Sequence, residues 1–240
     1  MKHFILVFLI LSHFTFARDA SRVGNGGGVL FCENREPILL DIYESVFNEI
    51  HTFENLNTIS IDQRRAVLED RISLFSKDYA KLLRDLRKYF YKKSHFLKVS
   101  SFKIPDDFNN LFYEATCDLK VVAVQRKPIL SFDDIFFINE PLWNLSGEMT
   151  REGLIDHEVL YLISLVKGAT TSKSVRKFLS FVLSDSFFAS SASEVEAMFY
   201  KNVFDSRWLS NTSAERKRYL INDLCKRLKK DYFFICPSFE

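Results

Sequence analysis

The sequence predicts an α+β domain in which a small β-sheet packs on a long amphipathic helix and the C-terminal half is helical. Three observations support this prediction. Short runs of β-branched and aromatic residues lie before Pro141, a heptad-like apolar stripe crosses 60–95, and helical periodicity continues after Pro141. The chain of 240 residues is 47% hydrophobic and shows no linker, so 29–240 is predicted to be a single domain.

The N-terminal segment 1–17 is typical of a secretory signal peptide. Lys2 supplies the positive start, 4–11 is an unbroken apolar run, and Thr15 and Ala17 place small residues before a cleavage point. The run is shorter than the roughly 20 apolar residues that span a bilayer. Segment 1–17 is therefore predicted to be removed, with an uncleaved anchor helix as the alternative. We expect a periplasmic or secreted protein with no transmembrane anchor after cleavage.

A glycine-rich stretch follows the expected cleavage point, and four of the seven glycines of the chain lie in 24–28. We interpret 18–28 as a flexible leader. The alternative is a nest of backbone N–H groups that binds an anion. The run lacks the residue spacing of a nucleotide phosphate loop, so no nucleotide site is predicted.

The β-strand pattern is confined to short segments. A strand is predicted at 29–32 with 37–40 as its hairpin partner, and Asp41 is expected to cap a helix over 42–52. Further strands are predicted at 97–103, at 134–138 and at 119–125, whose valine-rich part 121–124 is dense enough for a central strand.

Segment 60–95 carries the clearest helical pattern of the chain. Ser60 and Gln63 form a capping box at its start. Apolar residues then recur at alternating spacings of four and three, with charged residues between them. We predict one long amphipathic helix that lies across a sheet or bundle, with a dimeric coiled coil as the alternative. The stripe consists of Leu68, Ile72, Phe75, Tyr79, Leu82, Leu86 and Tyr89.

A second helix is predicted at 154–166, capped by Thr150 and ended by Gly168. This helix is apolar around nearly its whole circumference, and a helix of that kind is buried. Its His157 and Glu158 are therefore expected to be partly buried, and a buried carboxylate must be paired or protonated. We predict a buried polar network in which an arginine, Arg176 or Arg151, pairs with the glutamate. The network consists of His157, Glu158, Tyr161 and Arg176.

The same pair of residues matches the start of HExxH, in which two histidines one turn apart bind zinc and the glutamate activates water. Tyr161 stands at the second histidine position, and only His51 and His95 remain elsewhere after the expected cleavage point. We therefore predict no metal ligand set and no cofactor. The alternative is a zinc site in which His157 is a ligand or base and Glu158 is the general acid or base.

All four cysteines follow the expected cleavage point, and an even number in an exported chain permits disulfides. Cys225 and Cys236 are close enough in sequence to link the C-terminal tail to the preceding helix. That pairing leaves Cys32 for Cys117. Four buried thiols that pack as small apolar side chains are the alternative.

The formal net charge of +2 does not favour binding to nucleic acid, which requires a strongly basic face. A basic amphipathic helix is nevertheless predicted over 213–230, with Leu220, Leu224 and Leu228 as its apolar stripe. We interpret its basic face as an ordinary solvated surface. Docking to anionic membrane lipid or to an envelope glycan is the alternative.

A series of short motifs occurs along the chain. They are Gly24-Asn25-Gly26-Gly27, Cys32, Leu39-Leu40-Asp41-Ile42-Tyr43-Glu44, Cys117, Leu142-Trp143, His157-Glu158 with Tyr161, Gly168 and Val175-Arg176. Together they resemble exported, uncharacterised proteins of predatory bacteria of the Bdellovibrio kind. The resemblance covers most of the chain after 1–17. It implies export and a shared fold, and it implies no activity.

Two functions are compatible with these features. The first is an exported interaction or structural protein of the cell envelope, with His157, Glu158 and Arg176 in a buried network. Its partner, an envelope surface or another protein, stays open. The second is an exported hydrolase, a degenerate zincin-like enzyme that uses His157 and Glu158.

Overall fold

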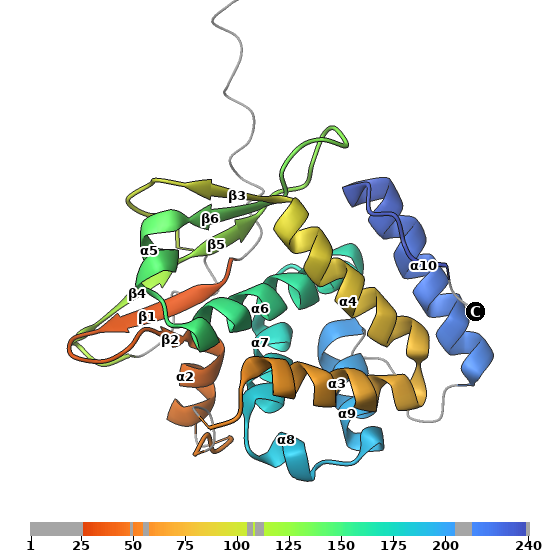
Figure 1. The fold of residues 1–240 in the computed structure, drawn as a ribbon, viewed down its shortest axis with the longest axis horizontal. Helices are drawn as coiled ribbons and strands as arrows, with labels where there is room; N and C mark the ends of the chain where they lie inside the picture. Colours follow the sequence, from red (N-terminus) through yellow and green to blue (C-terminus); the bar gives the residue numbers. More distant parts are fainter. Residues whose placement is uncertain are drawn as a thin grey trace, which may run out of the picture.

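The computed structural model describes residues 26–48, 50–54, 58–104, 108, 113–204 and 213–238. Within these residues the predicted α+β fold is confirmed, with two three-stranded sheets and a helical C-terminal half (Figure 1). The expected signal peptide and the first part of the expected leader, 18–25, lie outside the described residues. None of the described helices combines the length and the apolar character that a membrane span requires.

The first sheet joins the predicted hairpin to a strand from much later in the chain. β1 (Gly28–Cys32) lies antiparallel between β2 (Ile38–Leu39) and β4 (Cys117–Val121). Successive residues of a strand point to opposite faces, and Val29 and Leu30 are both fully buried. The sheet is therefore covered on both faces, by two separate apolar clusters.

The second sheet contains β3 (Ser94–Leu97), β5 (Ala123–Gln125) and β6 (Phe136–Asn139). β6 lies in the middle, parallel to β3 and antiparallel to β5. The first of these strands begins earlier than the predicted 97–103. β3 starts directly after Lys93, which ends the preceding helix. The Lys93 carbonyl accepts the N–H groups of Ile135 and Phe136 at the start of β6 and so aligns the two strands.

Segment 119–125 is not the single central strand that its valines predict. The Val122 N–H donates to Gly27 O at 3.0 Å, and the Val122 carbonyl accepts from Asn139 N at 2.8 Å. The backbone hydrogen bonds thus pass from one sheet to the other at this residue. β4 and β5 are each the last strand in the order of a sheet, while β1 and β6 are central.

The predicted long helix is two helices, α3 (Ile61–Phe75) and α4 (Lys77–Lys92). Ser76 has an extended backbone with φ −164° and ψ 104°, and its hydroxyl accepts the Tyr79 N–H. The serine therefore ends α3 and caps α4. The predicted capping box at the start of α3 is confirmed. The apolar stripe packs within the chain, against α6 and α9 among other elements.

The predicted buried helix is α6 (Glu148–Val166), which crosses the middle of the molecule (Figure 1). It begins after Gly147, so Thr150 is not its cap; the Thr150 hydroxyl donates to Pro37 O instead. Its predicted end is confirmed, with Gly168 at φ +96°. The other helical elements are α5 (Glu140–Leu145), α7 (Lys173–Leu183), α8 (Ser186–Ala189), α9 (Ala192–Phe199), the π-helical turn η3 (Tyr200–Phe204) and α10 (Ala214–Tyr232).

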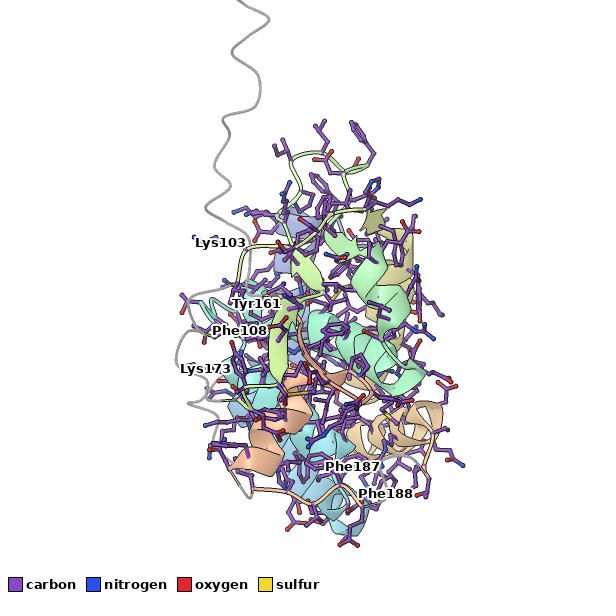
Figure 2. All side chains as sticks on the ribbon, turned by 90° about the vertical axis from the view of Figure 1, so that its left-hand side faces the viewer. Lys103, Phe108, Tyr161, Lys173, Phe187 and Phe188 are labelled. Carbon is purple, nitrogen blue, oxygen red and sulfur yellow. A yellow bond between two sulfur atoms is a disulfide. The ribbon has the colours of Figure 1, made fainter. Side chains whose placement is uncertain are left out.

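Aromatic side chains fill much of the interior of the helical half. Tyr79 meets three rings of α9 and η3 edge to face, with ring centroids 5.3 to 5.9 Å apart. Phe187 and Phe188 lie toward the lower end of the same half (Figure 2). Edge-to-face pairs of this kind add to the stability that burial itself supplies.

The glycine run belongs to the fold from Gly26 onward, so the predicted leader, 18–28, extends too far. Gly26, Gly27 and Gly28 are all buried. A Cβ on Gly26 would lie 1.8 Å from a carbonyl oxygen of β5, and a Cβ on Gly27 would lie 2.4 Å from Leu154 of α6. These positions need glycine because the backbone passes directly against its neighbours.

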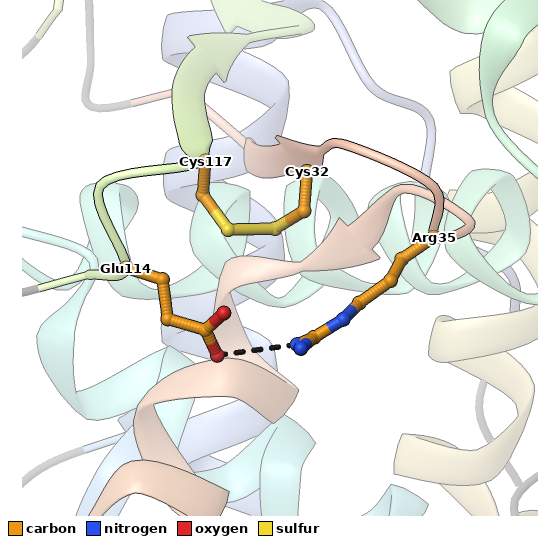
Figure 3. Close-up of a disulfide and its surroundings, with 4 residues drawn as sticks. All are labelled: Cys32, Arg35, Glu114 and Cys117. Carbon is orange, nitrogen blue, oxygen red and sulfur yellow. Dashed lines mark hydrogen bonds and ion pairs between the residues drawn. A yellow bond between two sulfur atoms is a disulfide. The ribbon is translucent and has the colours of Figure 1, made fainter.

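The four cysteines are paired as the sequence favoured. Cys32 and Cys117 lie opposite each other in β1 and β4 and form a disulfide (Figure 3). Cys225 of α10 bonds to Cys236 in the segment that follows the helix. The first bond closes one end of the sheet, and the second attaches the C-terminal segment to α10.

The C-terminal amphipathic helix is also confirmed, with Ser213 as the N-cap of α10. Leu224 and Leu228 are buried as predicted. Leu220 is only half-buried because Ile221 occupies the inward position at this turn.

Candidate functional site

α6 places His157 and Glu158 in the interior of the protein, where both residues are 0% exposed. Burial is therefore complete rather than partial, since α4, α7, α10, β2 and β5 all contact α6. The two adjacent side chains face different elements. His157 meets α2 (Leu40–Phe47), and Glu158 meets the chain entering β1 and the end of β5.

The Glu158 carboxylate is bonded through both oxygens. Its Oε1 accepts the Gly27 N–H at 2.7 Å, and its Oε2 accepts from Gln125 Nε2 at 2.6 Å. The same Gln125 nitrogen donates to the Glu158 carbonyl at 2.7 Å. Burial raises the pKa of Glu158, although His157 and these hydrogen bonds act in the opposite direction. The group that accepts from the glycine run is thus the carboxyl group of Glu158 in the same chain.

His157 forms a buried pair with Asp41, with Nδ1 and Oδ1 2.9 Å apart. Burial alone would lower the pKa of His157, but the charge of Asp41 and its hydrogen bond outweigh burial, and the net pKa is raised. Among the described residues, the second oxygen of Asp41 and the Nε2 of His157 have no hydrogen-bond partner. Each of the two side chains therefore uses one polar atom for the hydrogen bond within the pair, and its other polar atom makes no hydrogen bond to a described residue.

The sequence predicted Asp41 as the cap of this helix, but Asp41 does not cap α2. The helix begins at Leu40 with Leu39 as its N-cap, so Asp41 lies inside the first turn. Its side chain is fully buried and turned toward α6 rather than toward the backbone N–H groups of its own helix. A carboxylate this deep requires a partner, and His157 supplies it.

Arg176 does not pair with Glu158. Its Nε and Nη2 donate to the Glu44 carboxylate at 2.7 and 3.3 Å, and its Nη1 donates to Ser172 Oγ at 2.8 Å. The guanidinium also lies 5.0 Å from the centre of the Phe108 ring. The predicted four-residue network is therefore wrong in its pairing. α2 provides one carboxylate to α6 and another to α7.

Tyr161 occupies the second position of the HExxH pattern, one turn after His157, with the two ring centroids 6.2 Å apart. His51 Nδ1 lies 3.3 Å from Ser186 Oγ, and burial lowers its pKa. His95 is exposed and lies 3.2 Å from Asp134. No three His, Cys, Asp or Glu residues in the described part of the chain are arranged to hold a metal ion.

A second polar cluster on α6 was missed by the sequence analysis. Asp156 bonds to Arg65 Nε at 2.9 Å and to Arg87 Nε at 2.7 Å, and Arg65 also bonds to Glu152. Asp156 therefore ties α6 to both α3 and α4. The charged residues between the apolar positions of 60–95 are typical of an amphipathic helix, but no local pattern identifies their partners.

The buried groups that the sequence did not identify as site residues are Asp41, Gln125 and the Gly27 N–H. Two of the three lie in motifs that carried the family resemblance, and Gln125 follows the valine-rich segment. Each lies at least 33 residues in sequence from its partner on α6. The local sequence could not assign them, because their contacts depend on how distant segments cross.

Comparisons with protein-family models, with curated proteins and with solved structures find no match to this chain. A histidine held by a carboxylate is suited to proton transfer, but only if a substrate can come within hydrogen-bond distance of it. The complete burial of His157 and Glu158 gives this pair the character of an internal structural contact.

Proposed function

We propose that this chain is an exported interaction or structural protein of the cell envelope, in which His157 and Glu158 stabilise the fold. One observation carries the structural role of this pair: both side chains are 0% exposed, and both carboxylate oxygens of Glu158 are bonded within the chain. These bonds hold the strand entry at Gly27 and the end of β5 against α6. The resemblance to exported proteins of predatory bacteria supports the exported location and carries no argument about the activity.

The location in the periplasm or outside the cell is also proposed. The signal-peptide pattern of 1–17 supports it, as do the two disulfides, since such bonds persist in oxidising compartments. Mass analysis of the protein recovered from the periplasm or medium should place its N-terminus near Arg18. An intact N-terminus at Met1 in the recovered protein would contradict cleavage.

The substitution Glu158→Gln tests the structural role. An amide offers one oxygen where the carboxylate offers two, so its NH₂ group must face either the Gly27 N–H or the Gln125 NH₂. We expect the free energy of unfolding in urea to fall by about 1–3 kcal/mol, the cost of an unsatisfied buried donor. The control is Glu148→Gln, an exposed change in the first turn of the same helix, which removes only a favourable charge at the helix N-terminus and should alter it by less than about 1 kcal/mol.

The hydrolase alternative makes the opposite prediction. It is favoured only by the His157 Nε2, which has no hydrogen-bond partner among the described residues. In a hydrolase, Glu158→Gln would leave stability near the wild-type value and abolish hydrolysis of a protein or glycan substrate. Stoichiometric zinc in the purified protein, lost together with that activity, would replace our proposal by the enzymatic one.

A further inference from the structure

The loop between β5 and β6, residues 126–135, projects from the second sheet beside the C-terminal end of α10 (Figure 1). An ion pair of 2.6 Å between Lys127 Nζ and Asp231 Oδ1 joins the two segments. Three apolar side chains of the loop are exposed: Ile129 at 66%, Leu130 at 49% and Phe132 at 76%. Single exposed apolar residues are common, but three within four positions of a projecting loop indicate a contact surface.

The loop is held by hydrogen bonds at both sides of its tip. Asp133 Oδ2 accepts the N–H groups of Ile129 and Leu130 at 2.8 and 2.9 Å. Lys93 Nζ donates to the carbonyls of Ser131 and Asp133 at 2.7 and 3.1 Å, and Lys93 itself is only 9% exposed. The apolar side chains are thus presented by an ordered backbone, so little entropy is lost when the tip binds.

The loop and the helix ends next to it carry exposed basic side chains. The acidic side chains nearby have partners: Asp133 bonds the loop backbone, Asp134 bonds His95, and Asp231 bonds Lys127. Exposed cations occur in the loop and in the last turns of α4 and α10, and one of them, Lys127, is paired with Asp231. They are Lys92, Arg126, Lys127, Lys229 and Lys230.

We propose that this tip docks onto a lipid bilayer that contains anionic headgroups. Ile129, Leu130 and Phe132 enter the interface between headgroups and acyl chains, and the flanking cations face the headgroup phosphates. Apolar residues accompanied by basic residues bind such surfaces both by burying apolar area and by attracting the anionic headgroups. A projecting tip suits an interface that yields around it, whereas a protein partner would need a matching pocket. This inference names the partner of the proposed envelope role and rests on that role for its location.

Binding to vesicles tests the proposal with the processed protein and variants that share its N-terminus. The wild type should sediment with vesicles of equal parts phosphatidylcholine and phosphatidylglycerol, and less with phosphatidylcholine alone. Phe132→Ser should lower the partition coefficient about tenfold, because its exposed ring leaves the interface. Replacing Lys229 and Lys230 by Gln should weaken binding to the anionic vesicles and reduce its sensitivity to salt.

Two matched controls have the same exposure on other elements. Leu74→Ser on α3 corresponds to Phe132→Ser, since both side chains are 76% exposed, and Leu145→Ser on α5 corresponds to Ile129→Ser at 66%. Neither control should change binding. The proposal is overturned if the wild type does not bind anionic vesicles, or if Phe132→Ser binds as well as Leu74→Ser. It is also overturned if the tip variants abolish self-association in sedimentation velocity without any effect on vesicles. None of these results bears on the Glu158→Gln test.

Discussion

Gly27→Ala is the sharpest test of how the N-terminal segment joins the fold. The new Cβ would lie 2.4 Å from Leu154 Cδ2 and 3.1 Å from Glu158 Oε1. Leu154 must leave its rotamer, and overpacking of a core costs about 1–3 kcal/mol. Movement of Glu158 also weakens its bond from the Gly27 N–H, which adds about 1 kcal/mol. We expect a loss of about 2–4 kcal/mol, seen as a fall in Tm of about 5–15 °C.

Thermal unfolding followed by circular dichroism measures this loss. Gly147→Ala is the control, because its Cβ would have no neighbour closer than 3.5 Å. It should change the free energy of unfolding by less than about 1 kcal/mol, since the weaker N-cap is offset by a less flexible unfolded chain. If the clash is the cause, adding Leu154→Ala to Gly27→Ala should cost less than the sum of the single changes. A Gly27→Ala protein as stable as the wild type would show that Gly27 is not packed against Leu154, as expected if 18–28 were a flexible leader.

Two further predictions concern pH and the disulfides. The pKa of His157 is raised in the folded protein, so its protonated form stabilises the fold. This stabilisation is fully present below the pKa of the unfolded chain, about 6.5, and is lost as pH rises through the pKa of the folded protein. The free energy of unfolding in urea should be lower at about pH 8 than at about pH 6, and His157→Gln should reduce this difference. A difference that His157→Gln leaves unchanged would contradict the buried pair. Replacing Cys32 and Cys117 by Ser should cost about 4–5 kcal/mol, and replacing Cys225 and Cys236 about 3, because the closed loops differ in length, 85 against 11 residues. Equal losses in urea unfolding would contradict the loop-entropy argument.

The helices show how far local patterns reach. The capping box at Ser60 and the apolar character of α6 predicted a helix start and a buried helix, because both depend on residues within a few turns. The break at Ser76 was missed, since the apolar stripe keeps its spacing across it. An extended serine that caps the next helix lets α3 and α4 pack on different neighbours, and periodicity alone does not record that choice.

The candidate site shows more clearly which contacts local patterns do not predict. His157 and Glu158 were identified because polar residues are rare on an apolar helix. Their predicted partner, Arg176, was wrong because it was chosen from the helix nearest in sequence. The actual partners, Asp41 and Gln125, are 116 and 33 residues away, and burial made them necessary without indicating which they would be.

Composition and periodicity predicted the fold class and the buried character of α6, and the spacing of the cysteines favoured one pairing. The folded chain shows in addition that the glycine run enters the core and that its backbone contacts Glu158. It also shows that α2 supplies the acidic partners of His157 and Arg176. These contacts cannot be read from local patterns, because a buried charge is neutralised or bonded by whichever distant segment crosses next to it. Those crossings are a property of the whole packed chain.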